Sequence, residues 1–470
     1  MLRFRQLRGR TRTDAARGLA KVRELLPPEY RPLTGPAIES QAATLAVDAA
    51  GLRYSVGDLR RLRLYSNAQM LAGEAYVKDG ELYGVIIKRP SETLVSPERA
   101  AQSAVWAGYV GYSLEGSQRT DEFEQAVATA FNANLEELVR TSERTRLFLN
   151  EQRTHADAPT GPEVSAAGVL KDKSARTLMQ AIKASGGLLV SDLPKQLPAG
   201  DRARIDEIQE KLLSSSLLEQ ETVIVCSKAR TPVLRYASDE DAEALAALNV
   251  RCSCGQPVQG EKRERSVTVT KLGRSLVDKS RWMTVLLVEE LRSLGVPLEH
   301  IFIEQLDGGD EMDCLAVIAG DTVLFELKDK EFSLGHAYSF AAKVGILRPD
   351  LSAVITTDKV GNDAREHFER AKKASMEGSR QRTLPVGSAP VFVEGVERLQ
   401  DELRAIGSTL TLDDANMFFE DVFLQAALSP SRFIAQMSAT DAASGSVEAV
   451  LPKPRRGGLS QPVKPAGGEA

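Results

Sequence analysis

The sequence contains few of the residues on which several classes of protein depend. Four cysteines and four histidines occur among 470 residues, which is too few for a framework of disulfide bonds. No apolar run is long enough to cross a bilayer, and the first residues lack the apolar core of a secretory signal. We therefore expect a cytoplasmic protein with reduced thiols and no membrane-spanning segment.

The excess of negative over positive charge is also small. The formal net charge is −5, so the chain as a whole does not attract nucleic acid, and any such binding depends on local clusters of Lys and Arg. One cluster lies at the start, where a single acid, Asp14, stands among six arginines: Arg3, Arg5, Arg8, Arg10, Arg12 and Arg17. We expect a solvated basic arm there, with a phosphate-contacting arm as the alternative.

The rest of the composition is typical of globular proteins, with 42% apolar and 27% charged residues. A chain of this length predicts about three domains. Its strand and helix patterns indicate the α/β class, as an α+β multidomain protein. The boundaries that we expect are 1–160 for an N-terminal α+β domain, 168–225 and 226–270 for two small central domains, 275–430 for a C-terminal domain and 438–470 for a disordered tail.

The N-terminal domain carries a hairpin pattern but no catalytic constellation. Residues 74–90 alternate in the manner of a strand pair around Lys78-Asp79-Gly80. Helical patterns follow at 97–115 and 120–150. We assign no chemistry to this domain and leave open the binding of a protein partner.

Three helix-length segments and a strand follow a loop rich in Pro and Gly. They are Ser174–Ser185, Ser191–Leu197, Asp201–Leu218 and Glu221–Val225. Their order resembles a winged helix, whose third helix enters the major groove of DNA. The third segment mixes acids with bases, which does not suit a phosphate backbone, so we favour an interdomain or protein contact over DNA reading.

The central insert holds three of the four cysteines. Cys252 and Cys254 resemble one knuckle of a zinc ribbon, and Cys226 begins another in which Ala229 stands where a second thiolate belongs. A structural zinc site needs four ligands, and no histidine is near in the sequence. We expect a degenerate ribbon with sub-stoichiometric zinc; the alternative is bound zinc with a fourth ligand from elsewhere.

The C-terminal domain contains a predicted hairpin. Its strands are Met312–Ala319 and Thr322–Lys328, and its turn is Gly320-Asp321. Alternate residues of both strands are apolar and share one face: Met312, Cys314, Ala316, Ile318, Val323, Phe325 and Leu327. The hairpin is therefore expected to be largely buried.

The other face of this hairpin carries charge. With the predicted turn, Asp313 lies opposite Lys328, and Glu326 is a diagonal neighbour of Asp313 on the same face. Two acids and a lysine in a hydrophobic hairpin need a compensating partner or a metal. The carboxylates are near enough in this register to hold one cation between them.

Asp313 followed by Glu326-Leu327-Lys328 resembles the pattern of the PD-(D/E)xK nuclease superfamily, an Asp and then Glu-x-Lys at a variable distance. The neighbouring elements have the order of that superfamily: helix Asp278–Leu294, strand His300–Glu304, the hairpin, helix Ser333–Ile346, strand Ser352–Thr357, helix Asp363–Ala374 and strand Val391–Glu394. The resemblance covers residues 275–425 and implies a restriction-endonuclease-like mixed sheet flanked by helices.

The resemblance also implies roles for these residues. Asp313 and Glu326 would hold Mg²⁺ or Mn²⁺, with the Leu327 carbonyl as a third ligand. Lys328 would orient or help to deprotonate the attacking water and offset the developing charge. The alternative is an Asp313–Lys328 salt bridge in an inert sheet.

Relatives often place an accessory polar residue on the helix after the lysine. His336, Tyr338 and Lys343 occupy that helix here. We expect packing or surface exposure for each of them, and an accessory role at the site is the alternative.

These patterns predict a metal-dependent nuclease that acts on nucleic acid, DNA before RNA. A nuclease joined to unrelated domains resembles the effectors of bacterial defence and restriction systems in architecture. The alternative function is an inactive nuclease fold with a winged helix, acting as a scaffold that binds nucleic acid or protein.

Overall fold

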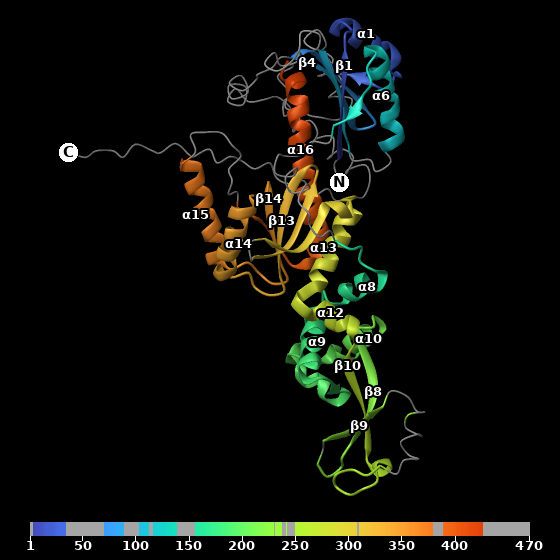
Figure 1. Cartoon of the computed structure of the whole chain (residues 1–470), viewed down its shortest axis with the longest axis vertical. Helices are drawn as coiled ribbons and strands as arrows, with labels where there is room; N and C mark the ends of the chain where they lie inside the picture. The colour runs from blue at the N-terminus through green and yellow to red at the C-terminus, as the bar shows by residue number, and fades with distance from the viewer. Residues whose placement is uncertain are drawn as a thin grey trace, which may run out of the picture. The chain divides into compact units, whose positions relative to one another are not determined.

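The computed structural model describes residues 3–33, 70–88, 103–111, 116–138, 156–229, 231–236, 241, 250–307, 310–378 and 389–425. The chain divides into two compact units, residues 1–141 with 401–470 and residues 142–400. Both units mix helices with sheets (Figure 1), which confirms the α+β multidomain class. No helix in the described ranges has the length and apolar character needed to cross a bilayer. The expected tail at 438–470 lies outside the described residues.

The first unit is built on a six-stranded antiparallel sheet of order β2-β3-β4-β5-β1-β6. Its strands are β1 (Arg3–Thr11), β2 (Arg31–Pro32), β3 (Met70–Lys78), β4 (Glu81–Lys88), β5 (Ser103–Gly111) and β6 (Glu136–Glu137). Helices α1 (Ala15–Leu25) and α6 (Gly116–Phe131) share with this sheet a core that includes Val22, Tyr83 and Phe131.

Helix α16 (Leu399–Gln425) begins in the second unit and continues in the first. Its Phe419 and Phe418 rings lie over Gly84 and Gly108 of the sheet, and a Cβ atom at Gly84 would be 2.5 Å from the Phe419 ring. These glycines allow the close approach. The sequence places residues up to 430 in the C-terminal domain, whereas this packing groups residues from 401 with the first unit.

The predicted hairpin of the first unit is confirmed, and the helix predicted at 97–115 is wrong over its described residues 103–111. β3 and β4 meet at a turn in which Asp79 and Gly80 both have positive φ. Residues 103–111, predicted to be helical, form β5, which pairs with β4 and β1. A strand buried on both faces lacks the alternation that distinguishes strand from helix in a sequence.

The expected basic arm at the start of the chain is also a strand. β1 pairs with β5 along its whole length, and its Leu7 is buried. Arg5 donates to the Glu124 carboxylate at 2.6 Å, and the Arg8 guanidinium lies 4.8 Å from the centroid of the Trp106 ring. Arg8 and Arg10 alternate with the buried Leu7, Gly9 and Thr11 and so lie on the exposed face of the strand, whereas Arg5 lies on the other face and is half-buried.

The second unit contains two sheets with their helices. The α-helices are α8 (Gly161–Val169), α9 (Lys173–Ser185), α10 (Ile205–Ser214), α12 (Lys271–Val277), α13 (Arg281–Ser293), α14 (Leu334–Leu347) and α15 (Asn362–Gly378). The 3₁₀ helices are η2 (Val190–Gln196), η3 (Ala199–Arg204), η4 (Val258–Gly260), η5 (Asp278–Ser280), η6 (Leu298–His300) and η7 (Val396–Arg398). The strands are β7 (Leu188–Leu189), β8 (Leu218–Val225), β9 (Pro232–Tyr236), β10 (Lys262–Val269), β11 (Ile301–Asp307), β12 (Asp310–Ile318), β13 (Asp321–Lys328), β14 (Leu351–Thr356) and β15 (Val391–Glu394).

The smaller sheet has the order β7-β10-β8-β9; β7 lies between α9 and α10 in the chain, and its other strands follow α10. The segment between these helices is 3₁₀, not α-helical, and contains Pro194, which has no N–H to donate. β10 pairs with β8 from Val225↔Lys262 to Leu218↔Val269. Although the sequence assigns residues 262–269 to the insert, they complete the sheet of the preceding domain, and residues 226–261 lie between two paired strands.

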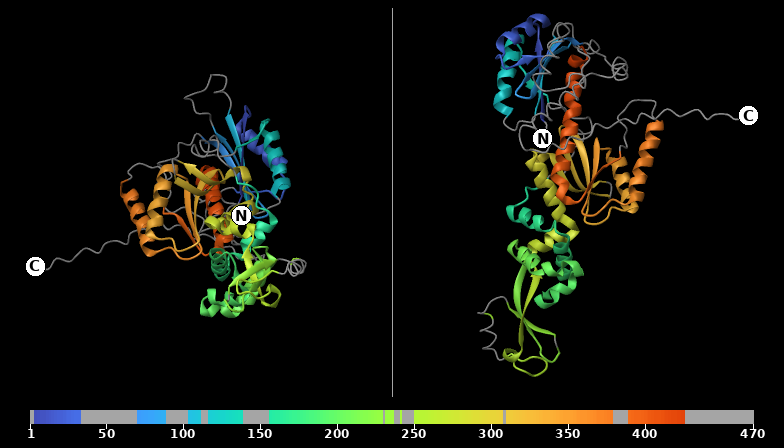
Figure 2. Two further views of the ribbon diagram at one scale, coloured as in Figure 1. Left: turned by 60° about the horizontal axis from the view of Figure 1, so that its bottom comes forward. Right: turned by 180° about the vertical axis from the view of Figure 1, so that it is seen from behind.

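The larger sheet has the order β11-β12-β13-β14-β15. β11, β12 and β13 are antiparallel neighbours, whereas β13, β14 and β15 run parallel. Figures 1 and 2 show α13 on one side of this sheet and α14 with α15 on the other. Leu315, Leu324 and Val354 of the sheet share a core with Phe340 of α14 and Phe368 of α15. The elements and their order are those that the sequence predicts for residues 278–394.

Candidate functional site

The hairpin that carries the candidate residues turns one residue earlier than the sequence predicts. Ile318 pairs with Asp321, so the turn residues are Ala319 and Gly320. Their φ angles are 52° and 86°. Two positive φ angles define a type I′ turn, whose twist matches that of the flanking strands. The Gly320-Asp321 turn is therefore a wrong prediction.

The corrected turn changes which charged residues are opposite. The ladder runs to Cys314↔Phe325, and its extension by one step places Asp313 opposite Glu326, with Lys328 as the diagonal neighbour. The predicted Asp313–Lys328 pairing is wrong by two residues. A shift by two leaves every side chain on the same face, so all three charged groups still share one side of the hairpin.

The charged side chains on this face form a compact cluster. Lys328 Nζ lies 2.8 Å from Glu326 Oε1 and 3.7 Å from Asp313 Oδ2. Lys343 of α14 reaches the other oxygen of Glu326, Oε2, at 2.9 Å. The Leu327 backbone N–H donates to Asp313 Oδ2 at 2.8 Å. Because the Glu326 side chain is only 3% exposed, these contacts take the place of water around its carboxylate.

Burial and mutual charge shift the pKa values of this cluster. Burial raises the pKa of Asp313, and repulsion by Glu326 raises it further against the attraction of Lys328. Burial lowers the pKa of Lys328, but Asp313 and Glu326 outweigh that effect and leave it above its ordinary value. A cation between the two carboxylates would relieve their repulsion.

The donor atoms suit a hard divalent cation. The N–H and C=O of one strand residue face the same neighbouring strand, so the Leu327 carbonyl, like its N–H, faces β12 and Asp313. Together with the carboxylates of Asp313 and Glu326, it provides the oxygen ligands that Mg²⁺ and Mn²⁺ prefer. The three predicted metal ligands therefore lie together, and their chemistry fits that metal class.

Of the three accessory candidates on α14, only Lys343 contacts the cluster. His336 accepts the Ser333 N–H through Nδ1 at 3.0 Å, and burial followed by the charges of Lys330 and Lys328 lowers its pKa. Tyr338 is 57% exposed, and its ring contacts His367. His336 therefore caps its own helix and Tyr338 lies at the surface. Lys343, for which the sequence favours packing or surface exposure, contacts the cluster.

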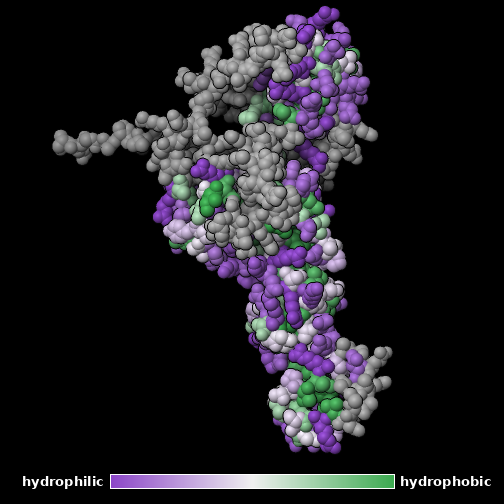
Figure 3. Space-filling model, in the orientation of Figure 1, coloured by the Kyte–Doolittle hydropathy of each residue, from purple (hydrophilic) through white to green (hydrophobic). Residues whose placement is uncertain are grey.

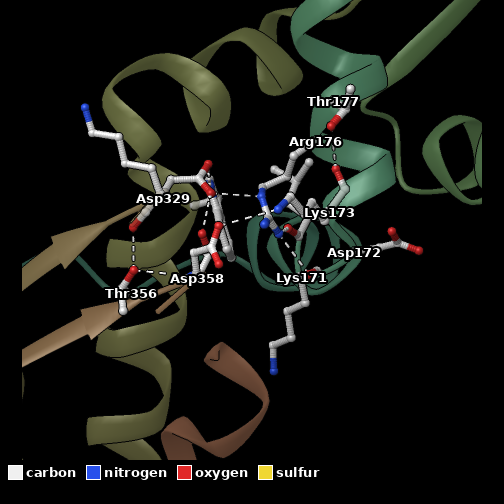
Figure 4. Close-up of polar contacts among 12 residues, drawn as sticks. Lys171, Asp172, Lys173, Arg176, Thr177, Asp329, Thr356 and Asp358 are labelled. Carbon is white, nitrogen blue, oxygen red and sulfur yellow. Dashed lines mark hydrogen bonds and ion pairs between the residues drawn. The ribbon is translucent and has the colours of Figure 1, made fainter. Parts of the chain in front are cut away.

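Asp329, the residue after Lys328, forms a buried ion pair with the winged-helix-like segment (Figure 4). Arg176 Nε of α9 lies 2.9 Å from Asp329 Oδ1, and the two side chains are 9% and 11% exposed. Asp329 also accepts from Trp282 Nε1 at 3.2 Å and from the Thr357 hydroxyl at 3.1 Å. The end of β13 is thus fixed by contacts from α9, from α13 and from Thr357, which directly follows β14.

The three cysteines of the insert lie together with an acid. Ligand atoms of Cys226, Cys252, Cys254 and Glu261 are all within 4.8 Å of one another. Glu261 stands just before β10, where no Cys or His motif marks it. The only sequence signal for it is an acid close to the second knuckle. The fourth potential ligand that the sequence analysis missed is therefore a carboxylate.

The segment predicted as one helix, Asp201–Leu218, forms the end of η3, helix α10 and the start of β8, and it carries paired charges. Arg204 Nη2 lies 2.7 Å from Asp172 Oδ2, and Lys211 Nζ lies 2.6 Å from Glu207 Oε1. Arg202 donates to the Leu197 carbonyl at 3.2 Å. These contacts give η3 and α10 a surface of mixed sign, the feature for which the sequence favours a protein or interdomain contact.

A basic surface lies in the first unit. A cavity of about 640 Å³ at the start of α1 is lined by Arg10, Arg12, Arg17 and Lys21, with Asp14 as its one acid. Its charge suits an anion. The phosphate-contacting role of these arginines stays a prediction.

Comparisons with known proteins add little. No family model matches the sequence, and no curated protein matches it. A solved structure that aligns with the chain is that of protein VC1899 from Vibrio cholerae, at 12% identity and a TM-score of 0.24. The alignment covers 58% of this chain and 59% of that one. A likeness of this size carries no argument about fold or function.

Proposed function

We propose that the hairpin β12–β13 forms the active site of a metal-dependent nuclease that hydrolyses phosphodiester bonds, of DNA in preference to RNA. The observation that carries this proposal is the convergence of Asp313, Glu326 and Lys328 on one face of the sheet. A purely structural sheet has no need of two acids at directly opposed positions, since such a pair is unfavourable.

Each residue has a role that follows from its position. Asp313, Glu326 and the Leu327 carbonyl would hold Mg²⁺ or Mn²⁺, which when bound supplies Lewis-acid polarisation of the phosphate. Lys328 extends its ammonium group to both carboxylates, where it would orient the attacking water and offset charge on the phosphate. Lys343 holds the far oxygen of Glu326 and so fixes the direction of that carboxylate.

One observation favours the alternative function of an inactive scaffold. The charges of Asp313, Glu326, Lys328 and Lys343 balance without any metal, because two lysines pair with Glu326. A nuclease-like fold that has lost its metal could be held together in this way. The choice between enzyme and scaffold therefore depends on activity.

The test is nicking of plasmid DNA, with an RNA substrate in parallel, by the full chain with Mg²⁺, Mn²⁺, Ca²⁺ or EDTA. We expect cleavage with the first two and none with Ca²⁺ or EDTA, since the looser coordination of Ca²⁺ does not support this chemistry. Glu326→Gln and Lys328→Ala should each abolish cleavage. The exposed neighbours Glu331 and Lys330 provide matched controls, and Glu331→Gln and Lys330→Ala should cleave normally.

The outcomes separate the two functions. Cleavage that persists in EDTA or in the Glu326→Gln variant would overturn the assignment of the site. Absence of cleavage of either substrate by the wild type with Mg²⁺ or Mn²⁺ would overturn the nuclease and favour the scaffold. An effector role in a defence or restriction system is part of the proposal and rests on the joining of this site to a winged-helix-like segment and a separate α+β unit.

A further inference from the structure

The insert between β8 and β10 brings four metal-ligating side chains to one point. Cys226 directly follows β8, Cys252 and Cys254 lie in a turn that closes with a Gly255 N–H bond to the Cys252 carbonyl, and Glu261 directly precedes β10. Their ligand atoms all lie within 4.8 Å of one another. In a tetrahedral site with Zn–S bonds of about 2.3 Å, sulfur atoms are about 3.8 Å apart. Small side-chain rotations would therefore close the tetrahedron.

The hydrogen bonds around these side chains orient them as ligands. The Ser227 N–H donates to Glu261 Oε2 at 2.6 Å, which turns the other oxygen, Oε1, toward Cys254 Sγ at 3.3 Å. The Ala229 N–H donates to Cys226 Sγ at 3.2 Å, and such a bond stabilises a thiolate. These backbone hydrogen bonds thus hold the side chains in fixed orientations, as hydrogen bonds around metal ligands generally do.

Burial makes the arrangement costly without a cation. Cys226 is fully buried, Cys252 is 4% exposed and Glu261 is 7% exposed. Within the described part of the chain, no Lys or Arg forms an ion pair with Glu261 (its bonds go to Ser227 and Cys254). A buried carboxylate needs a charge partner or a metal, and three sulfurs next to it make a soft metal the fitting partner.

Among its described residues, the insert is joined to the sheet by the pairing of β9 with β8 and has a small apolar cluster. The hydrophobic cluster that it shares with β8 and β9 contains three buried residues, Ile224, Tyr236 and Val258. Figure 3 shows apolar side chains gathered at the surface of this part of the chain, which in Figure 1 lies around β9. Modules of this size with so small a core commonly depend on a metal or on disulfides.

We propose that Cys226, Cys252, Cys254 and Glu261 bind one structural Zn²⁺ ion that closes the insert. Three thiolates and a carboxylate fill all four positions of a tetrahedral site, so the ion has no open position for catalysis. Zinc is favoured over Mg²⁺ because thiolates are soft ligands, and over an iron–sulfur cluster because those clusters are commonly held by four cysteines. The proposal is independent of the nuclease activity.

The experiment measures zinc per chain in the full protein, purified from zinc-supplemented culture without chelator. We expect about one zinc ion per chain, and its loss in Cys252→Ser and Glu261→Gln. The matched controls are Cys314→Ala, at a buried cysteine of the larger sheet, and Glu264→Gln, at the next acid along the chain. Both controls should keep the zinc.

A second measurement guards against variants that fail to fold. Co²⁺ added to the metal-stripped wild type should give the thiolate-to-cobalt charge-transfer absorption and the visible bands of a tetrahedral site. Less than about a tenth of a zinc ion per chain together with an octahedral cobalt spectrum would overturn the proposal. So would full zinc content in the Cys252→Ser variant, or a disulfide between these cysteines in the protein as purified.

Discussion

The two ligand clusters of the second unit differ in what surrounds them. The hairpin cluster has oxygen and amine groups, lies on a sheet between packed helices, and balances its own charges through Lys328 and Lys343. The cysteine cluster has thiols and one acid, lies in an insert with a minimal core, and has no basic partner for Glu261 among the described residues. A metal at the first site would add chemistry to a fold that is stable without the metal. A metal at the second would be part of the fold.

The largest expected effect is a separation of the two sites by function. Asp313→Asn should lower the cleavage rate by about 10³-fold, the scale of removing one essential group of a catalytic unit, while the protein keeps its zinc. Cys252→Ser should lose zinc and retain cleavage in the fraction that remains folded. Cleavage assays and elemental analysis on the same preparations check both. Loss of both properties in either variant would mean that the clusters are not distinct.

A smaller effect concerns the stability of the hairpin cluster. Glu326→Ala removes the partner of two lysines that are 23% and 11% exposed, so it should lower the free energy of unfolding by about 3 kcal/mol in EDTA. Adding Lys343→Met to that variant should recover part of the loss. Urea denaturation measures both. If Glu326→Ala is as stable as the wild type, the repulsion between the two carboxylates outweighs their attraction to the lysines.

The buried pair between Arg176 and Asp329 tests whether the two regions are coupled. Arg176→Ala should cost about 2 kcal/mol of unfolding free energy, because Asp329 keeps its bonds to Trp282 and Thr357. It should also slow cleavage, since Asp329 directly follows Lys328. Lys173, on the same helix as Arg176, forms an ion pair with Asp358 at 3.5 Å. The Lys173 side chain is 78% exposed.

That exposed pair is the matched control. Lys173→Ala should change stability by less than about 0.5 kcal/mol and leave cleavage unchanged. Arg176→Lys should restore part of the cleavage rate if the pair positions the end of β13. Equal losses from the Arg176 and Lys173 variants would contradict the importance of burial, and would leave the winged-helix-like segment without an effect on the site.

The smallest expected effect tests the register on which the hairpin cluster depends. Gly320→Ala should destabilise the protein by about 1 kcal/mol, because φ at this position is 86°. Ala319→Gly should stabilise it by about 0.5 kcal/mol, because relief at φ 52° exceeds the added chain entropy. Thermal unfolding can resolve the two signs. With the turn at Gly320-Asp321, position 319 would be an ordinary strand residue, and Ala319→Gly would destabilise.

The sequence predicts local features of this molecule better than distant contacts. Alternation alone placed Asp313, Glu326 and Lys328 on one face, because an error of two residues in the register does not change the face. The turn itself was misplaced, since Gly320 fits a type I′ turn as its second residue and a type II′ turn as its first. The same local patterns predict the type and the order of the helices and strands of the larger sheet.

Contacts between distant segments could not be predicted in the same way. Arg176 and Asp329 are far apart in the sequence, and neither residue type marks a buried pair. Glu261 resembles any acid beside a strand until folding brings it to the cysteines. Lys343 was visible on its helix, but only the packing of α14 against the sheet turns it toward Glu326.

The place where the insert leaves the sheet makes it a replaceable module. Val225 and Lys262, which bound it, are paired neighbours on β8 and β10, and Figure 1 shows the two strands side by side. The ends of the insert are therefore as close together as the ends of a short loop, and its length costs the sheet little in loop-closure entropy. The strands would accept a tight turn in its place. Its loss would remove the edge strand β9 from the smaller sheet but no residue of the hairpin cluster, which lies on a different sheet.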